Sequence, residues 1–568
     1  MKRFSTGIFS LGVLLFITFS FAQQENILKA MKEELHRSYN ALSRVKPVSL
    51  YFLEYELWDE YKKEISAVLG ALYNDSEERH IYADIDVRVG SPRLDNTHEI
   101  RGGTELDFLD WIPSIVEVPV DHNPQALKAI LWAETDRRFK KALEKYTKVL
   151  AEKQVKVVES DTSPDFSNAS AQKYYADDVD ITLDFNPWKE KIRRFSEIFK
   201  NFPWIYNSYV SLSTTLLTKY LVNTDGTEIK ENRLAYRIRI YAATMADDGM
   251  ELYLVKTFYA TDPERLPDDA TVSTAIDSLI GRLDALRKAP LVEPYTGPAI
   301  LVNEASGVFF HEIFGHRIEG HRQKSEFEGQ TFTKKVGKQI LPSFISVYDD
   351  PTMNSFEGTD LNGFYRFDDE GVPAHKVTVV ENGILKNFLM SRSPIAGFPE
   401  SNGHGRRSYG HQVVSRQGVL YIKSDKEVPF PELRRALINE CRKQNKEYGL
   451  IFYDISGGFT STGRSGTQTF KVIPLYVKRV YVDGRPDEVV RGVDIVGTPL
   501  LSFSKIELTG DDYKVFNGTC GAESGWVPVS AISPSIFVSE IEVEKKSKGQ
   551  EKPPILPSPV QSSKERRQ

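Results

Sequence analysis

The chain has 568 residues, 40% of them hydrophobic, and its 73 basic and 79 acidic residues give a formal net charge of −6. A chain of this length and composition can bury a large core, which we expect to be divided between two domains. The balanced charge, without a basic stripe that carries interleaved aromatic residues, argues against nucleic acid as a partner.

The first residues have the pattern of a secretory signal peptide. Lys2 and Arg3 precede an apolar run over residues 7–19, and a Ser-Phe-Ala sequence that suits cleavage ends at Ala22. We therefore expect a signal peptide over residues 1–22, cleavage after Ala22, and export to the periplasm or the exterior. The alternative is an uncleaved anchor, but the run is shorter than the ~20 residues that span a bilayer, so no stable membrane anchor is expected.

Residues 23–293 are expected to form an N-terminal domain of mixed α and β structure. Apolar spacing predicts a helix over residues 23–45, and strict alternation predicts a half-buried strand over residues 80–89. A second helix, rich in Ala, Leu and Lys, is predicted over residues 124–152 with Asn123 as its N-cap.

The end of this domain has the pattern of strands followed by a helix. A strand that runs into a turn is predicted over residues 219–227, and further strands over residues 235–242 and 251–260. A last helix is predicted over residues 270–287, and Pro290 beyond it marks the end of the domain.

Residues 294–545 are expected to form a second domain, in which strands and glycine-rich turns surround one short helix that carries the metal-binding motif described next. An amphipathic helical run is also present over residues 431–441. The charged, proline-containing segment over residues 546–568 is expected to be disordered. The fold class expected from these patterns is α+β.

His311, Glu312 and His316 place two imidazoles and a carboxylate on the short helix of the second domain. Imidazole is a favoured zinc ligand, and a Glu beside the first His is the usual general base of a metallopeptidase. The spacing is HExxxH, and residues five apart are turned by roughly 140° around a regular helix. Both His residues reach one metal only if the helix widens or ends between them, which the backbone freedom of Gly315 would permit. The alternative is two ordinary helix histidines.

Cys520 is the candidate for a third metal ligand, because catalytic zinc takes three protein ligands and leaves one position for water. It lies in a glycine-flanked turn over residues 517–525. The alternatives are a buried, inert thiol or a disulfide with Cys441, the only other cysteine. Cys441 ends the amphipathic run over residues 431–441 and is expected to face a core.

Together these residues resemble the TldD/PmbA metallopeptidase family. Further segments resemble motifs of that family in the family's order, between about Tyr295 and Glu544: residues 295–301, 315–320, 367–373, 380–385, 402–407 and 457–460. The resemblance implies that His311, His316 and Cys520 bind one divalent metal ion, zinc in the first place with iron as the alternative. It also implies that Glu312 is the catalytic carboxylate.

The function implied by the resemblance is that of an exported metal-dependent peptidase acting on unfolded or extended peptides. A metal-activated water would attack the peptide bond, with Glu312 as the general base. The family works as twofold dimers, so a homodimer or a heterodimer with a family paralogue is expected. Two alternatives remain: a non-catalytic binding or assembly subunit, and a metal-dependent hydrolase of another amide or ester. The chain keeps both His residues, the Glu and the Cys, which favours the enzyme.

Four polar loop residues accompany the motif. Arg406 and Arg407 could clamp a substrate carboxylate or the oxyanion, but paired loop arginines are more often solvated or salt-bridged. Asp368 and Asp369 are expected to shape a turn rather than to take part in chemistry.

Three further histidines are expected to lie outside the metal site. His321 stands where the family often has an acidic residue; it could add a ligand or occupy the surface, and we expect it at the surface. His404 and His411 belong to loops, where histidines usually do not bind metal.

Overall fold

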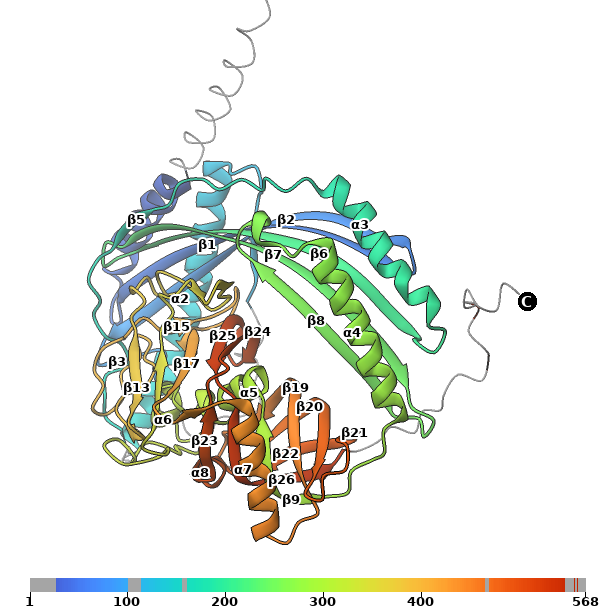
Figure 1. Cartoon of the computed structure of the whole chain (residues 1–568). Coiled ribbons are helices and arrows are strands. Elements are labelled where there is room, and N and C mark those ends of the chain that lie inside the picture. Colours follow the sequence, from blue (N-terminus) through green and yellow to red (C-terminus); the bar gives the residue numbers. More distant parts are fainter. Residues whose placement is uncertain are drawn as a thin grey trace, which may run out of the picture.

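The computed structural model describes residues 27–100, 114–155, 161–464 and 469–546, together with Leu556 and Pro559 (Figure 1). The predicted signal peptide over residues 1–22 and nearly all of the predicted tail over residues 546–568 lie outside the described residues. Within the described ranges, no helix is both long and apolar enough to cross a membrane.

The N-terminal part is built on an eight-stranded sheet, whose centre consists of long antiparallel strands in the order β2-β1-β6-β7. These are β1 (Leu50–Val68), β2 (Ala71–Ser91), β6 (Asn207–Asn223) and β7 (Glu228–Met245). Shorter strands complete the sheet: β3 (Leu94–Asp95), β4 (Val116–Val118), β5 (Lys173–Tyr175) and β8 (Glu251–Ala260). In Figure 1 the long strands arch over the C-terminal part of the chain.

Helices cover one face of this sheet in two groups. The first group is a helix over residues 27–42 with α2 (Pro124–Gln154), and the second is α3 (Phe185–Glu197), η2 (Ile198–Asn201) and α4 (Asp269–Lys288), with η3 (Pro263–Arg265) before α4. Odd-numbered residues of β1 face the helices, so that Leu53 packs in the first core and Ile65 in the second. Two separate apolar cores therefore lie along the same long strands.

The elements predicted for this part are confirmed where the structure describes them; of the helix predicted over residues 23–45, residues 23–26 lie outside the described residues and the helix ends at residue 42. α2 begins at Pro124, and the side chain of Asn123 accepts hydrogen bonds from the backbone N–H groups of Gln125 and Ala126. The helix predicted over residues 270–287 is α4, and the strand predicted over residues 80–89 belongs to β2.

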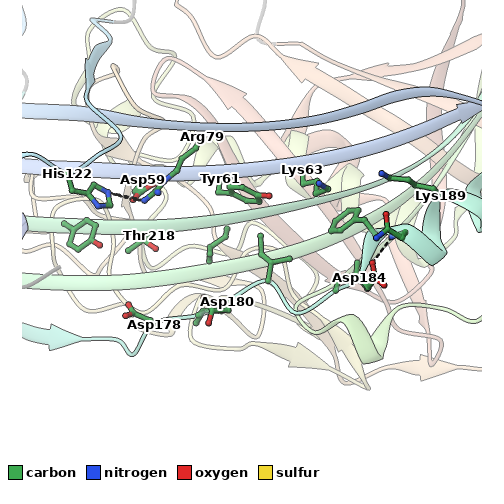
Figure 2. A pocket seen from close by; sticks show the side chains of 17 residues that line it. Asp59, Tyr61, Lys63, Arg79, His122, Asp178, Asp180, Asp184, Lys189 and Thr218 are labelled. Carbon is green, nitrogen blue, oxygen red and sulfur yellow. Dashed lines mark hydrogen bonds and ion pairs between the residues drawn. The ribbon is translucent and has the colours of Figure 1, made fainter. Parts of the chain in front are cut away.

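A polar cavity of about 630 Å³ lies on the helix-covered face, between the two groups of helices (Figure 2). Asp59, Tyr61 and Lys63 of β1 line it, and Asp59 is paired there with His122. These odd-numbered residues point away from the C-terminal part, because it contacts the opposite, even-numbered face of β1 through Glu56. None of the candidate metal-site residues lines this cavity.

In the C-terminal part, five strands close into a barrel, because β9 pairs with both β19 and β26 while β19, β20, β22 and β26 follow one another in the sheet. The ring strands are β9 (Tyr295–Leu301), β19 (Tyr448–Thr460), β20 (Phe470–Tyr481), β22 (Val493–Gly497) and β26 (Ile536–Lys545). The same sheet includes β18 (Glu427–Val428), β21 (Glu488–Val490) and β23 (Ile506–Gly510). α7 (Phe430–Lys443) packs outside the ring, and α8 (Pro499–Ser504) precedes β23.

A second sheet, of six strands, faces the barrel across α5 (Asn303–Ile313), which packs against β19 on one side and β24 and β25 on the other. Its strands, in spatial order, are β14 (Ile384–Leu385), β13 (Val377–Glu381), β10 (Ile345–Asp349), β17 (Val419–Ser424), β25 (Gly525–Ser533) and β24 (Lys514–Ala522). The remaining short elements are η4 (Gly315–Arg317), α6 (His321–Lys324), β11 (Ser355–Phe356), β12 (Thr359–Asp360), β15 (Gly405–Arg406) and β16 (Val414–Ser415). The expected α+β fold class, with a strand-rich C-terminal part, is confirmed.

Buried ion pairs join the large sheet to the C-terminal part. Arg407 donates to Glu56 at 2.8 Å, and Lys219 lies 3.1 Å from the other oxygen of the same carboxylate. Lys219 also pairs with Asp369. Because breaking one partner of a buried pair leaves an uncompensated charge, these contacts fix how the sheet sits over the loops below it.

The same interface predicts a pH dependence of stability through Glu54. Burial raises the pKa of Glu54 to about 8, from an ordinary value of 4.5, although Arg407 and Asn223 oppose the shift. Between these two values the folded state holds the proton more tightly than the unfolded chain, so stability falls as pH rises from about 4.5 to about 8. We expect Glu54→Gln to remove this fall.

The measurement is the unfolding temperature at several pH values between 5 and 8, with the exposed Glu78→Gln on β2 as the control. Relative to the wild type, Glu54→Gln should gain stability as pH rises, whereas the control should follow the wild type. A parallel pH profile for all three proteins would contradict the assignment.

Candidate metal centre

The helix that carries the first candidate ligand ends before the second. α5 ends at Ile313, and a single 3₁₀ turn, η4, follows over Gly315–Arg317. The last α-helical bond runs from Phe314 N–H to the carbonyl of Phe310 at 2.9 Å. The interruption lies between His311 and His316, as the HExxxH spacing requires if both are to face one point.

Gly315 is needed at this break for its missing side chain rather than for unusual backbone angles. Its φ does not lie in the left-handed region. A Cβ atom at this position would overlap the side-chain amide of Gln417, which is buried and donates to the carbonyl of His311. The sequence attributed the need for glycine at position 315 to backbone freedom, whereas the structure attributes it to close packing against Gln417.

We expect Gly315→Ala to destabilise the protein by about 1–3 kcal/mol, because Gln417 must move and give up its bond to His311. Gly281→Ala is the matched control: a Cβ there meets nothing within 4 Å, and the residue lies inside α4. The control should instead stabilise by about 0.4–1 kcal/mol. Denaturant unfolding measures both, and equal effects of the two changes would contradict the packing explanation.

The structure brings His311, His316 and Cys520 together. Each offers one ligand atom, and these atoms all lie within 4.8 Å of one another, with all three side chains buried. Nε2 of His316 lies 3.3 Å from Sγ of Cys520, which stands on β24 of the β24–β25 hairpin. Cys441 is buried in a separate apolar core, and both thiols are free. The disulfide alternative is therefore wrong, and Cys441 faces a core as expected.

The electrostatics of this group favour a negatively charged thiolate at Cys520, which can bind a cation. Burial by itself raises the pKa of Cys520, but attraction by His316, His311 and Arg416 outweighs it and leaves the pKa well below 9.0. Burial likewise lowers the pKa of His316, but Cys520 and Glu319 outweigh it and hold the pKa well above 6.5. The pocket therefore stabilises a thiolate, which is the form that binds metals.

The donor set fits a divalent metal ion. Nδ1 of His311 is buried and has no hydrogen-bond partner among the described residues, although buried polar atoms are normally satisfied. One thiolate and two imidazoles make up a three-ligand set of the kind found at catalytic zinc. A metal at this point would satisfy His311 and replace the protons that otherwise balance the charge of Cys520.

Glu312 lies beside this group, with its carboxylate available to accept a proton. Its side chain is largely buried, yet within the described part of the chain its carboxylate makes no hydrogen bond or ion pair. A Cβ on Gly458 of β19 would lie 3.0 Å from Cγ of Glu312, so this glycine makes room for the carboxylate. Sequence reasoning did not assign a role to Gly458; the available signal was a glycine pair inside a strand.

Sequence reasoning also missed a charged group beneath His316. Nδ1 of His316 lies 3.3 Å from the carboxylate of Glu319, which is fully buried. Burial raises the pKa of Glu319, but His316, Arg322 and Arg416 outweigh it and hold the pKa at about 2. The segment around Glu319 was noted only as part of a family motif, because its partner Arg416 lies far along the chain.

The three other histidines lie outside the metal group. His321 is not at the surface as expected: its side chain is 17% exposed and pairs with the carboxylate of Glu523. His404 is fully buried, with Nε2 3.2 Å from Asp349. His411 stands in the loop after β15, where its backbone N–H donates to the carbonyl of Ser408 at 3.3 Å.

The paired arginines are structural. Arg407 is salt-bridged to Glu56 but is buried rather than solvated, and Arg406 donates to the carbonyls of Gln417 and Pro528. Neither faces open space, so the substrate-clamp hypothesis receives no support. Asp368 shapes a turn as expected, since it accepts hydrogen bonds from backbone N–H groups, among them that of Val372.

Residues 294–545 match the family profile of the PmbA/TldA metallopeptidase C-terminal domain. The chain is similar to a protein named metalloprotease from Methanothermobacter thermautotrophicus, with 28% identity over 244 residues, 41% of this chain and 47% of that protein. It is also similar to a zinc metalloprotease TldD homolog from Saccharolobus solfataricus, with 29% identity over 248 residues, 43% of this chain and 51% of that protein. The chain spans about half the length of these curated relatives.

Among solved structures, the fold is similar to that of TldE from Thermococcus kodakarensis. The TM-score is 0.56 at 16% identity, and the match covers 91% of this chain and 100% of that chain. At this identity the likeness concerns the fold alone.

Proposed function

We propose that this chain, whose residues 294–545 form a PmbA/TldA metallopeptidase C-terminal domain, is a zinc-dependent peptidase that hydrolyses unfolded or extended peptides. The observation that carries the proposal is the buried group of His311, His316 and Cys520 beside a carboxylate, Glu312, that has no partner in the described part of the chain. The similarity to proteins named metalloprotease supports it, and iron remains the alternative metal.

The metal ligands and Glu312 have separate roles in the proposed reaction. His311, His316 and Cys520 would hold the metal, which when bound supplies Lewis acidity and lowers the pKa of water. Glu312 accepts the proton of the attacking water and returns it to the leaving amine. Because Gly458 carries no side chain, its position leaves room for the side chain of Glu312.

An extended peptide fits the strand next to Glu312. β19 pairs with β20 as far as Thr460, but its pairing with β9 on the other side covers only Leu450–Phe452. Within the described residues, the rest of this edge has no strand partner. A peptide added there would be bound through main-chain hydrogen bonds with little sequence selectivity.

The test compares one substrate protein in its folded and its denatured form, incubated with the purified mature chain while the mass in solution is measured. We expect cleavage of the denatured form only, by a dimer, most simply a homodimer and otherwise a heterodimer with a related chain. Equal cleavage of both forms would contradict the restriction to unfolded or extended peptides, and full activity of a monomer would contradict the expected dimer.

The two other functions predict different results. A non-catalytic binding or assembly subunit would bind peptides without cleaving them, with metal present. A hydrolase of another amide or ester would spare peptides and cleave small amide or ester substrates in a metal-dependent reaction. The retention of Glu312 together with all three candidate ligands favours an enzyme over a non-catalytic subunit.

Export is part of the proposal and rests on the sequence of residues 1–22. We expect the mature protein to begin at Gln23 and to be recovered outside the cytoplasm. Fractionation of cells and N-terminal sequencing of the recovered protein test this. An intact N-terminus in the cytoplasmic fraction would contradict it.

A further inference from the structure

Glu319 lies directly behind the second candidate ligand. Its carboxylate is 3.3 Å from Nδ1 of His316, while Nε2 of the same ring is 3.3 Å from Sγ of Cys520. One ring nitrogen therefore faces the carboxylate and the other faces the candidate ligand group. A carboxylate that accepts the Nδ1 proton fixes the ring orientation and leaves the lone pair on Nε2.

Two buried arginines connect this carboxylate to the hairpin that carries Cys520. Arg322 donates from Nε to Glu319 and from Nη2 to Glu523, both at 2.8 Å. Arg416 lies with Nε 3.4 Å from Glu319 and donates from Nη2 to the carbonyl of Cys520 at 2.8 Å. Glu319 is thus the common partner of His316 and of both arginines.

These contacts cross between segments that are far apart in sequence. Glu319 and Arg322 follow η4, Arg416 follows β16, and Cys520 and Glu523 belong to the β24–β25 hairpin. Arg416 and Glu319 are completely buried, so their charges are compensated only by one another and by these neighbours. Removing Glu319 would leave two buried guanidinium groups without their shared carboxylate.

We infer that Glu319 is a positioning residue, which orients His316 and, through Arg322 and Arg416, holds Cys520 at a fixed distance from it. The ligand group is consequently formed before a metal arrives. The inference rests on the proposed function only in taking these three side chains as metal ligands. It adds a residue that controls metal affinity without touching the metal or the substrate.

The test is the affinity of the full mature chain for Zn²⁺, measured by competition with a chromophoric chelator, together with the visible spectrum of the Co²⁺ form. We expect Glu319→Gln to weaken Zn²⁺ binding by about 10- to 100-fold and to shift the Co²⁺ bands, because the ring of His316 is less firmly oriented. Glu319→Asp, which keeps the charge, should recover part of the affinity.

Glu328→Gln is the matched control. Glu328 accepts from Nη1 of Arg322 at 2.6 Å but, among the described residues, contacts neither His316 nor the Cys520 hairpin, so affinity and spectrum should stay as in the wild type. Glu523→Gln weakens the link from Arg322 to the hairpin, together with the pair between Glu523 and His321, but keeps the contact of Glu319 with His316, so it should weaken binding less than Glu319→Gln.

The outcomes distinguish a failure of the proposed metal site from a failure of the positioning role of Glu319. A wild-type chain that binds neither Zn²⁺ nor Co²⁺ would contradict the proposed metal site. A wild type that binds, with Glu319→Gln equal to it in affinity and spectrum, would overturn the positioning role alone. If Glu319→Gln does not fold, Glu319→Asp and Glu523→Gln decide: unchanged affinity in both would also overturn it.

Discussion

Replacing Glu312 with Gln is expected to lower peptide hydrolysis by about 10²- to 10⁴-fold while the bound metal is retained. Gln keeps the size of the side chain but cannot accept a proton. The carboxylate makes no hydrogen bond or ion pair in the described part of the chain, so the change disturbs little else. The measurement is kcat/KM on an unstructured peptide, with metal content determined on the same sample.

Glu304→Gln provides the control for this change. Glu304 lies in the first turn of the same helix, with 42% of its side chain exposed. Its replacement should leave both hydrolysis and metal content close to those of the wild type. Near-normal hydrolysis by Glu312→Gln would rule out the general-base role.

Replacing Cys520 with Ala is expected to remove both the metal and the activity. Loss of one of three ligands leaves two imidazoles, and the metal contributes several kcal/mol to catalysis, which corresponds to a loss of roughly 10³-fold or more. His316→Ala should behave in the same way. Metal content by elemental analysis and kcat/KM on the same peptide provide the measurements.

Cys441→Ala is the matched control, since this is the only other thiol and its side chain, on α7, is buried in a separate apolar core. It should keep the metal and the activity, with a loss of stability of about 1–3 kcal/mol from the small cavity. Full metal retention by Cys520→Ala would show that the thiol is not a ligand.

These expectations were partly accessible from the sequence. The HExxxH spacing predicts an interruption between His311 and His316 from helix geometry alone, and the structure has it after Ile313. The N-cap at Asn123 follows from local hydrogen bonding in the same way. A helix interruption and an N-cap depend on residues within one or two helical turns of each other, so the sequence pattern can predict them.

The remaining features depend on contacts between distant segments. The need for Gly315 comes from Gln417, and the burial of Arg407 comes from its partner Glu56 on β1. His321 was expected at the surface because nothing near it in sequence shows that Glu523 lies beside it. No periodicity or spacing rule encodes such pairings, since the partners lie far apart in sequence and look like ordinary residues of separate segments.

The closure of the C-terminal barrel has a consequence for the order of synthesis. β9 and β26 are the first and last strands of that part, and they lie side by side with Tyr295 opposite Val543. The ring cannot be completed until almost the whole chain has left the ribosome, and such long-range pairing is slow. A nascent chain therefore remains open until β26 has been synthesised. A polypeptide that stops short of β26 would leave β9 with an unprotected edge and become a substrate for quality-control proteases.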